Sequence, residues 1–436
     1  IPGKTTNHFL KISKKFNCYI VIGMPEVDEI NNLYYNSAVL IGPNGIVGKH
    51  RKSHPYIAEP KWACNGNNDH EVYETEIGKI SLLICMDLHF FETSRIQAIK
   101  DVDIICHISN WLAERAPAPY WINRAFENNC YVIESNRWGL ERTVQFSGGS
   151  CIINPDGQIQ NFIDTGNGIV YGEVDVTHSY KKVLEEKVFE KRRPELYAEL
   201  MNNSFTWNPN DFFTLYGKNP IPKGKKSVVS VVQSFPKNDI VKNINFIEKT
   251  VRKLKEKEKS DLVLFPELFI TGIDNPFERA LDLKSSHVDR LCKIAIKNKV
   301  YIISGFAEIK RDKLFNSVVI LGEEGILGTY QKTHLSNDDE DWASHGSNLK
   351  TFDTKIGRIG VSIGTENFYP EISRILSIKG CDLILSPSAI YGKFTSKHQG
   401  TKIPHNYPIP TGYDPYHWHL IRVRAGENNV YNAFSN

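Results

Sequence analysis

Along the chain, two kinds of apolar pattern alternate. Short runs rich in β-branched residues, typical of buried strands, are followed by longer stretches in which apolar residues return every three or four positions, typical of helices. The clearest strand-like runs are 104–108, 228–233, 262–265 and 300–304, and the clearest helical stretches are 92–100 and 240–257. In the last stretch, the apolar stripe consists of Ile240, Ile244, Ile247, Val251 and Leu254. This alternation predicts an α/β fold.

The pattern occurs twice along the chain. The matching pairs of segments are 34–41 with 314–321, 48–54 with 328–334, and 77–80 with 356–359. One apolar run ends at Cys85, and its counterpart in the second half ends at Gly364. Internal repetition indicates repeated structural units. We therefore expect a tandem repeat whose second copy carries glycine where the first copy carries cysteine.

Domain boundaries follow from this repeat. We expect a first domain at 1–215, a linker at 216–226 and a second domain at 227–436, because the linker mixes Pro, Gly and Lys. The first strand-like segment, 18–23, corresponds to 300–305, which lies well inside the second domain. We therefore expect the first domain to lack its N-terminal strand and the second domain to be truncated at its C-terminus.

Composition restricts the class of protein. With 41% hydrophobic and 24% charged residues the chain is typical of globular proteins, and its net charge of +3 gives no reason to expect nucleic acid. No apolar run approaches the roughly 18 residues of a membrane helix, and no signal segment opens the sequence. We therefore expect a soluble, cytoplasmic protein without a membrane partner. The eight cysteines include no CxxC pair, which favours free thiols.

A histidine-containing insertion at 392–416 raises the question of a metal site. The histidines in or directly after it are His398, His405, His417 and His419. They lack the regular spacing of metal ligands, and no cysteine pair accompanies them. We therefore expect no metal, and we expect no other cofactor.

Cys85 is the candidate nucleophile, because it ends an apolar run from which its thiol could project into a cleft. A thiol is mostly protonated near neutral pH, so a nucleophilic cysteine needs a nearby cation or base. Lys52 could supply the cation, and a carboxylate could carry the proton from the thiol to a leaving amine. Glu, Lys and Cys at the ends of neighbouring strands would form such a site.

Several ordered motifs carry a family resemblance. They are segments 48–55, 83–87, 124–128, 147–157 and 265–269, and they include Leu-Ile-Cys-Met-Asp and Phe-Pro-Glu-Leu-Phe. In content and order they resemble the signatures of the nitrilase superfamily, the carbon-nitrogen hydrolases, over nearly the whole chain. The resemblance implies α-β-β-α sandwich domains, here in tandem. It also implies pairing of such domains, so we expect a homo-oligomer.

The resemblance also implies roles for individual residues. Lys52 would stabilise the tetrahedral intermediate, Cys85 would attack, and Glu59 would be the additional glutamate after the lysine. The backbone N–H of Met86 would help to form the oxyanion hole.

Further residues lie on segments expected to rim the cleft and bind the oxyanion or the substrate. These are His89, Trp111 and Glu127, although single residues of these types are often packing or capping groups. Asp87, two residues after Cys85, is similar to the amidase and carbamoylase branches, whereas nitrilases usually carry Trp-Glu after the cysteine.

The two copies depart from the family pattern in different ways. The general-base glutamate of the first copy would precede Ile1. Glu267 matches that motif but belongs to the second copy, together with Lys332 and with Glu340 near the position of Glu59. Because Gly364 has no side chain, we expect the second site to be vestigial. It would then be a ligand pocket without chemistry or an interface.

Together these features predict a thiol-dependent hydrolase of a non-peptide C–N bond in a small amide or N-carbamoyl compound. The reaction would pass through a Cys thioester and release ammonia or an amine. Two alternatives stay open. One is nitrile hydrolysis by the same site, and the other is a catalytically silent pseudoenzyme that serves in binding or assembly.

Overall fold

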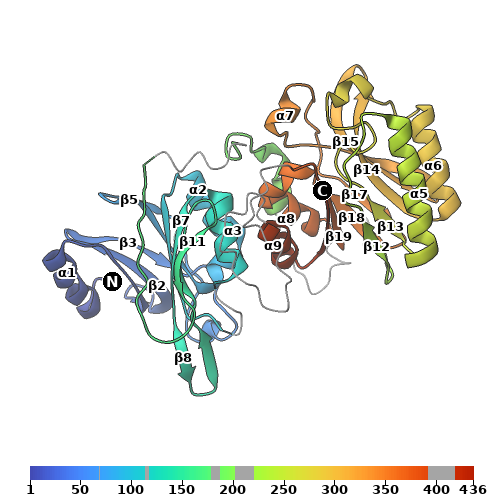
Figure 1. The fold of residues 1–436 in the computed structure, drawn as a ribbon. Coiled ribbons are helices and arrows are strands. Elements are labelled where there is room, and N and C mark those ends of the chain that lie inside the picture. Colours follow the sequence, from blue (N-terminus) through green and yellow to red (C-terminus); the bar gives the residue numbers. More distant parts are fainter. Residues whose placement is uncertain (68, 113–116, 178–186, 202–219, 391–417) are drawn as a thin grey trace. The chain divides into compact units, whose positions relative to one another are not determined.

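A computed structural model describes residues 1–67, 69–112, 117–177, 187–201, 220–390 and 418–436, with the side chains of 418 and 419 left aside. These residues fall into two compact units (Figure 1). The first unit consists of described residues up to 177, and the second of described residues 187–390 and 420–436. Both units mix helices and strands, so the α/β prediction is confirmed.

The first unit contains two main sheets. The smaller is an antiparallel sheet of β1 (Ile20–Asp28), β2 (Leu33–Gly42) and β3 (Gly45–Arg51), against which α1 (Lys4–Phe16) packs. The larger has the order β11-β10-β7-β6-β5-β4, and its β5, β6 and β7 run parallel. Its strands are β4 (Val72–Thr75), β5 (Gly78–Ile84), β6 (Ile104–Ser109), β7 (Tyr131–Asn136), β10 (Ser150–Ile153) and β11 (Ile159–Ile163). A hairpin of β8 (Trp138–Glu141) and β9 (Val144–Ser147) stands apart from both sheets.

The last five residues of strand β5 are buried on both faces of the sheet, which explains why all of them except Ser81 are apolar. On one face, Leu82 belongs to a cluster with Leu40 of β2, so the two sheets share this part of the core. On the other face, Leu83 belongs to a cluster with Trp121 of α3 (Pro119–Asn128). The order of layers is therefore helix, sheet, sheet, helix. Helix α2 (Phe91–Ile99) packs against α3.

The second unit also has two sheets. One has the order β12-β13-β14-β15-β16 and the other the order β17-β18-β19-β20. The strands of the first are β12 (Val229–Val231), β13 (Leu262–Leu264), β14 (Tyr301–Lys310), β15 (Lys313–Gly322) and β16 (Gly325–Gln331). Those of the second are β17 (Thr351–Thr354), β18 (Gly357–Val361), β19 (Leu383–Pro387) and β20 (Tyr431–Ser435). Helix α8 (Pro370–Ile378) follows β18, and α9 (Trp418–Asn428) precedes β20.

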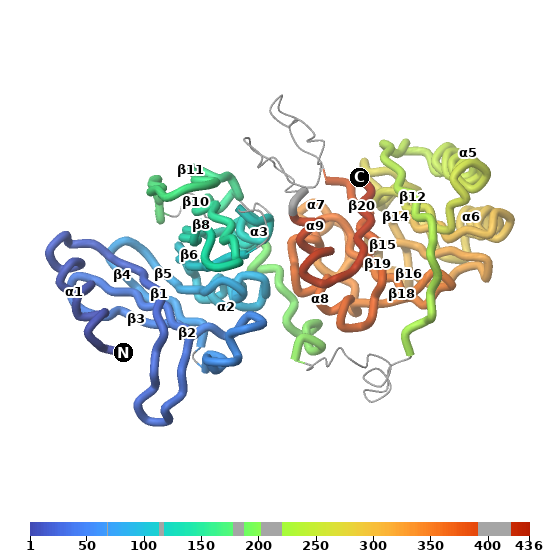
Figure 2. The backbone as a smooth tube through the Cα atoms, turned by 90° about the horizontal axis from the view of Figure 1, so that it is seen from below, coloured from blue at the N-terminus to red at the C-terminus, as the bar shows by residue number. Residues whose placement is uncertain are grey.

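Helices α5 (Ile240–Glu258) and α6 (Ser286–Asn298) lie side by side over the five-stranded sheet (Figures 1 and 2). Helix α5 begins where the Asp239 side chain accepts a hydrogen bond from the backbone N–H of Lys242. Its buried residues include Ile244, Ile247 and Val251, which belong to the predicted apolar stripe. The helices predicted at 92–100 and 240–257 and the four predicted strands are all confirmed.

A segment that precedes the predicted linker packs onto the second unit. Residues 187–201 belong to that unit by their contacts. In this segment, Arg193 Nη1 donates to the carbonyl oxygen of Thr333 at 3.1 Å, and the Tyr197 hydroxyl lies 2.7 Å from His334 Nε2. The structural division thus falls before residue 187, ahead of the linker predicted at 216–226. Of that linker, residues 220–226 are described and carry no helix or strand.

No helix in the described parts of the chain combines the length and the apolar character needed to cross a lipid bilayer.

Candidate active site

Cys85 lies at the carboxyl end of β5, where the strand turns into the short 3₁₀ helix η2 (Cys85–His89). Its φ of 47° is in the left-handed region, which is costly for a residue with a Cβ and which often marks a functional position. Gly364 begins the corresponding 3₁₀ helix η7 (Gly364–Phe368) after β18, and its φ is 51°. The same sharp turn therefore ends a strand in each unit.

Asp87 connects the Cys85 turn with the segment that carries Lys52. Its buried carboxylate accepts the backbone N–H of Ile84 at 3.1 Å on one oxygen, and the backbone N–H groups of Ser53 and His54 at 3.1 and 2.9 Å on the other. His50 Nε2 lies 2.8 Å from the first oxygen. Burial opposes ionisation, but contacts with His50 and His54 outweigh it and hold the pKa of Asp87 well below its usual range. Asp87 is thus an ionised bridge between the two segments.

Lys52 and Glu59, two residues named from the sequence, lie in contact. The two side chains form an ion pair, and Lys52 is almost fully buried. Asn36 of β2 donates from Nδ2 to the other Glu59 oxygen at 2.6 Å. The Asn36 carbonyl also accepts the backbone N–H of Lys52 at 2.8 Å. A buried ion pair of this kind is held in one geometry by its additional hydrogen bonds.

The protonation of Cys85 differs from the sequence expectation that a lysine keeps the sulfur ionised. Burial raises the pKa of the Cys85 thiol to about 11, although the charge of Lys52 and the backbone N–H of Asn110 act to lower it. Glu134 and Glu59 raise this pKa further. The expectation is wrong because desolvation of the thiolate outweighs the attraction of a single ammonium group. At neutral pH the thiol is protonated, so its proton must leave as it attacks.

This raised pKa predicts the pH dependence of alkylation. Because the folded thiol ionises only near pH 11, the thiolate fraction and the rate of iodoacetamide labelling of Cys85 should rise about tenfold per pH unit between pH 7 and 10. In a Lys52→Met protein the rate should fall at each pH, since the charge that lowers the thiol pKa is gone. Peptide mass spectrometry measures both rates, with buried Cys151 as the slow internal reference. A plateau of the Cys85 rate near pH 8 would contradict the structure.

His89 and Trp111 lie together beside the Cys85 turn. His89 is the last residue of η2, and its ring stacks on that of Trp111 with centroids 4.6 Å apart. Tyr120 lies 4.7 Å from the same ring on a tilted plane. Burial, with the charges of Arg124 and His107, lowers the pKa of His89 to about 4. His89 is therefore a neutral aromatic group at neutral pH.

The remaining residues predicted for the first site have different positions. Met86 follows Cys85 in η2, as expected for a backbone oxyanion donor. Glu127 of α3 is fully buried in an ion pair with Arg124 and accepts the Asn123 side chain at 2.8 Å. Arg124 in turn donates to the carbonyl oxygens of Leu88 and His89. The carboxylate of Glu127 thus holds the arginine that contacts η2, and its role toward a substrate stays a prediction.

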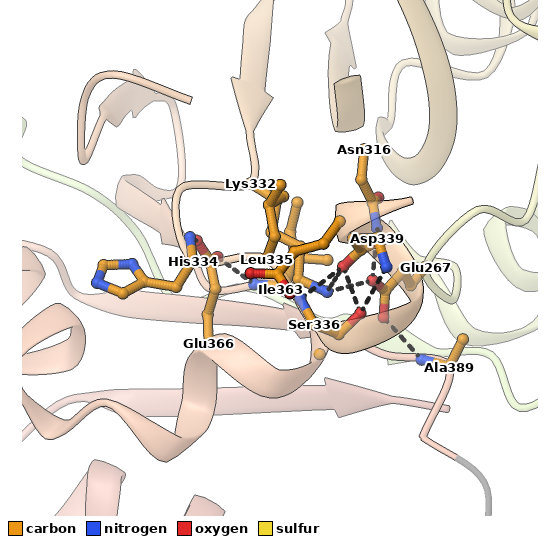
Figure 3. A network of polar contacts seen from close by, with 12 residues as sticks. Glu267, Asn316, Lys332, His334, Leu335, Ser336, Asp339, Ile363, Glu366 and Ala389 are labelled. Atoms are coloured by element: carbon orange, nitrogen blue, oxygen red, sulfur yellow. Dashed lines mark hydrogen bonds and ion pairs between the residues drawn. The ribbon is translucent and has the colours of Figure 1, made fainter. Parts of the chain in front are cut away.

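Lys332 in the second unit lies in a denser network of carboxylates (Figure 3). Its Nζ lies 2.8 Å from Glu267 Oε1 and 2.6 Å from Asp339 Oδ2. Asn316 donates to both acids at 2.8 Å, as Asn36 does to Glu59. The charges of Asp339 and Glu267 overcome the effect of burial and raise the pKa of Lys332 above its usual range.

Asp339, and not Glu340, is the acid that contacts Lys332. The short helix α7 (Asn337–Glu340) is capped by Ser336, whose side chain accepts from the Asp339 backbone N–H at 3.2 Å. This turn directs Asp339 inward, whereas Glu340 points outward and pairs with Lys191 at 3.0 Å. The expectation for Glu340 is therefore wrong by one position, because the direction of a side chain in a four-residue helix depends on its cap.

Glu267 takes up the space beside Gly364. A Cβ built on Gly364 would overlap Glu267 Oε2. The same oxygen accepts the backbone N–H of Ala389 at 3.0 Å. Ala389 follows β19 as Asn110 follows β6, and the Asn110 N–H acts on the Cys85 thiol. In the second unit a carboxylate oxygen thus occupies the surroundings that a sulfur atom has in the first.

Sequence analysis missed three polar groups around Cys85. Asn36 could have been found, because the Asn-Ser pair at 36–37 recurs at 316–317. His107 and Glu134 are fully buried on neighbouring strands β6 and β7, where they interrupt apolar runs and carry no motif. Nowhere in the described ranges do three or more His, Cys, Asp or Glu side chains gather as a metal site would require. His398, His405 and His417 lie outside these ranges, and the His419 side chain is not described.

The chain is similar to known proteins of one family. The chain matches the sequence model of a family described as carbon-nitrogen hydrolase at residues 1–182 and 228–436. It is 32% identical to a nitrilase of Pyrococcus abyssi over 45% of this chain and 74% of that protein. It is 33% identical to a probable nitrilase of Schizosaccharomyces pombe over 46% of this chain and 75% of that protein. It is 29% identical to the 2-oxoglutaramate amidase of Bacillus subtilis over 45% and 77%, respectively. The chain therefore belongs to the carbon-nitrogen hydrolase family of enzymes.

Proposed function

We propose that the first unit hydrolyses a non-peptide C–N bond of a small amide or N-carbamoyl compound, with Cys85 as the nucleophile. The observation that carries the proposal is the ionised Asp87, which ties the Cys85 turn to the segment of Lys52. A nucleophile on a strained turn, linked rigidly to a buried cation, is an arrangement suited to acyl transfer.

The proposed reaction has two stages. The Cys85 sulfur attacks the amide carbon while its proton passes to a carboxylate. Glu59, the additional glutamate, holds Lys52 in the site through their ion pair. Lys52 and the backbone N–H of Met86 stabilise the negative oxygen of the tetrahedral intermediate. The C–N bond breaks, the amine leaves with the proton, and a thioester remains on Cys85. Water then attacks the thioester and releases the acid.

The substrate class is supported by the surroundings of Cys85. The neutral His89 ring, stacked with Trp111, gives the site a flat and uncharged side. Asp87 occupies the position where nitrilase-like sequences usually carry Trp-Glu, which favours amides over nitriles. Nitrile hydrolysis by the same thiol is a narrower variant of the proposal, in which a thioimidate replaces the thioester. We expect the enzyme to act as a homo-oligomer without a cofactor.

We further propose that the chain is a tandem of two α-β-β-α sandwiches, the second of which is catalytically silent. Gly364 offers no nucleophile, and the Glu267 carboxylate fills the adjacent space. By sequence, this tandem divides into a first domain at 1–215, a linker at 216–226 and a second domain at 227–436. Residues 187–201 fall within the first of these ranges but belong to the second sandwich by their contacts.

A second candidate function is binding or assembly without catalysis. The specific observation in its favour is the high pKa of Cys85, about 11, which leaves the free protein without a preformed thiolate. Under this alternative neither unit turns over a substrate, and Lys52 and Glu59 serve only the fold.

Trapping of the acyl-enzyme tests the proposal and separates these candidates. The full chain is incubated with matched panels of small amides, N-carbamoyl compounds and nitriles, quenched in acid and analysed by peptide mass spectrometry. We expect an acyl group on the Cys85 peptide and release of ammonia with amides or N-carbamoyl compounds. Acylation by nitriles alone would support the nitrile variant. No adduct on Cys85 and no ammonia with any panel would favour the binding protein.

A further inference from the structure

A buried histidine-glutamate pair lies directly behind the nucleophile turn. His107 of β6 and Glu134 of β7 face each other in the strand register, and both side chains are fully buried. His107 Nδ1 contacts Glu134 Oε2, and its Nε2 lies 2.9 Å from the carbonyl oxygen of Cys85 itself. The Ser109 hydroxyl donates to the other Glu134 oxygen at 2.6 Å.

The partners of His107 determine which of its atoms carry protons. A carbonyl oxygen can only accept, so Nε2 must carry a hydrogen and donate it to the Cys85 carbonyl. Nδ1 then faces the carboxyl group of Glu134, with one proton held between the two. The pair is an imidazolium with a carboxylate, or an imidazole with a carboxylic acid. In both forms its net charge is zero, as a fully buried pair requires.

The second unit shows the same turn without this pair. By strand register, Ser386 of β19 and Phe434 of β20 stand where His107 and Glu134 stand in the first unit. There the Gly364 carbonyl accepts instead from the Asn367 side chain at 2.9 Å. A turn of this shape can therefore be held by a neutral amide alone, and the buried pair occurs with the cysteine.

We propose that His107 and Glu134 are positioning residues, which hold the carbonyl of Cys85 and thereby fix the direction of its sulfur. Only the nucleophilic role of Cys85 is taken over from the proposed function. The strained φ of 47° explains why such a device is needed, since a residue relaxes from the left-handed region unless its surroundings hold it. Glu134 serves to keep His107 oriented with Nε2 toward the carbonyl.

Position and charge make different predictions for the reactivity of the thiol. Because the pair has zero net charge, its removal without any change in the position of the sulfur should leave the rate of alkylation near that of the parent, or raise it through loss of the Glu134 carboxylate, which raises the pKa of Cys85. In its present position the sulfur benefits from Lys52 and from the Asn110 N–H, which both lower its pKa. If the pair holds that position, its removal turns the sulfur away from these groups and slows alkylation.

The test uses the double variant His107→Ser/Glu134→Phe in the full chain, which installs the side chains that the second unit carries at these positions. Since replacement of both partners of a buried ion pair by uncharged residues leaves no unpaired charge, we expect little change in the unfolding midpoint. Iodoacetamide labelling of Cys85 at pH 8 should slow at least about tenfold, and turnover should fall about a hundredfold in kcat with little change in KM. Labelling at the parental rate or faster would overturn the proposal.

Two further variants keep the test decisive. Glu134→Gln retains hydrogen bonding to His107 and should lose much less activity than the double variant. An equal loss of activity would show that the charge of Glu134, and not the position of the sulfur, matters, and it would overturn the proposal.

If the double variant does not fold, His107→Asn takes its place, since the shorter asparagine side chain can meet Glu134 but not the Cys85 carbonyl. Ser386→Ala in the second unit is the matched control, with no expected change.

The labelling measurement needs no substrate, so it separates this inference from the proposed function. A chain that forms no acyl-enzyme but shows slower labelling in the double variant would contradict the hydrolase and support the positioning pair. A chain that hydrolyses amides, but whose Cys85 is labelled equally fast in the parent and in the double variant, would support the hydrolase and contradict the positioning pair.

Discussion

Replacement of Cys85 by alanine is expected to abolish amide hydrolysis while leaving the chain folded. The sulfur is the only atom at this position that can form the thioester, and removal of a hydrolase nucleophile lowers kcat on the order of 10⁵- to 10⁶-fold. The smaller side chain relieves rather than adds crowding at a partly exposed site. Ammonia release from the amide panel, together with the unfolding midpoint of both proteins, measures the effect.

Cys292→Ala supplies the matched control. Cys292 is a partly buried free thiol on α6 of the second unit, and its loss should leave the rate unchanged. Ammonia release by Cys85→Ala at the parental rate, from each amide that the parent cleaves, would remove Cys85 from the mechanism.

Lys332→Met is expected to have the largest effect on stability. The ammonium group lies within 2.8 Å of two buried carboxylates, and the substitution leaves Glu267 and Asp339 without their cation. Loss of one partner of a buried ion network costs about 3–5 kcal/mol. Urea unfolding, monitored by hydrogen exchange, should show that the loss of stability lies in the second unit. At temperatures below unfolding, hydrolysis through Cys85 should persist.

Two variants control for this prediction. Lys355→Met removes an exposed lysine that pairs with Glu323 and Glu324, and it should leave the unfolding midpoint near that of the parent. Glu267→Gln and Asp339→Asn, added to Lys332→Met, remove the uncompensated charges and should recover most of the stability. Equal stability of Lys332→Met and the parent would contradict the network as described.

The parts of this molecule that sequence could predict are those set by local pattern. Helix α5 was predictable from its apolar stripe, and the strand before Cys85 from the apolar residues that close it, Leu82, Leu83 and Ile84. Lys52 and Glu59 were named through the family resemblance, and their ion pair joins two residues only seven positions apart in the chain.

The parts that sequence could not predict depend on burial and on partners far away in the chain. The pKa of Cys85 is set by how much water the folded site excludes, which no motif encodes. Glu127 belongs to a family motif, yet its use is decided by Arg124 one turn away. The contact of His107 with the Cys85 carbonyl exists only because β5 and β6 are adjacent in the sheet.

The carboxylate beside Gly364 affects what a substitution at this position can achieve. Under the proposal that the second unit is silent, a cysteine introduced at position 364 would bring a Cβ that collides with an acid anchored by Lys332, Asn316 and the Ala389 amide. One substitution at this position would therefore not by itself create a working nucleophile. A second change that moves Glu267 would be needed as well.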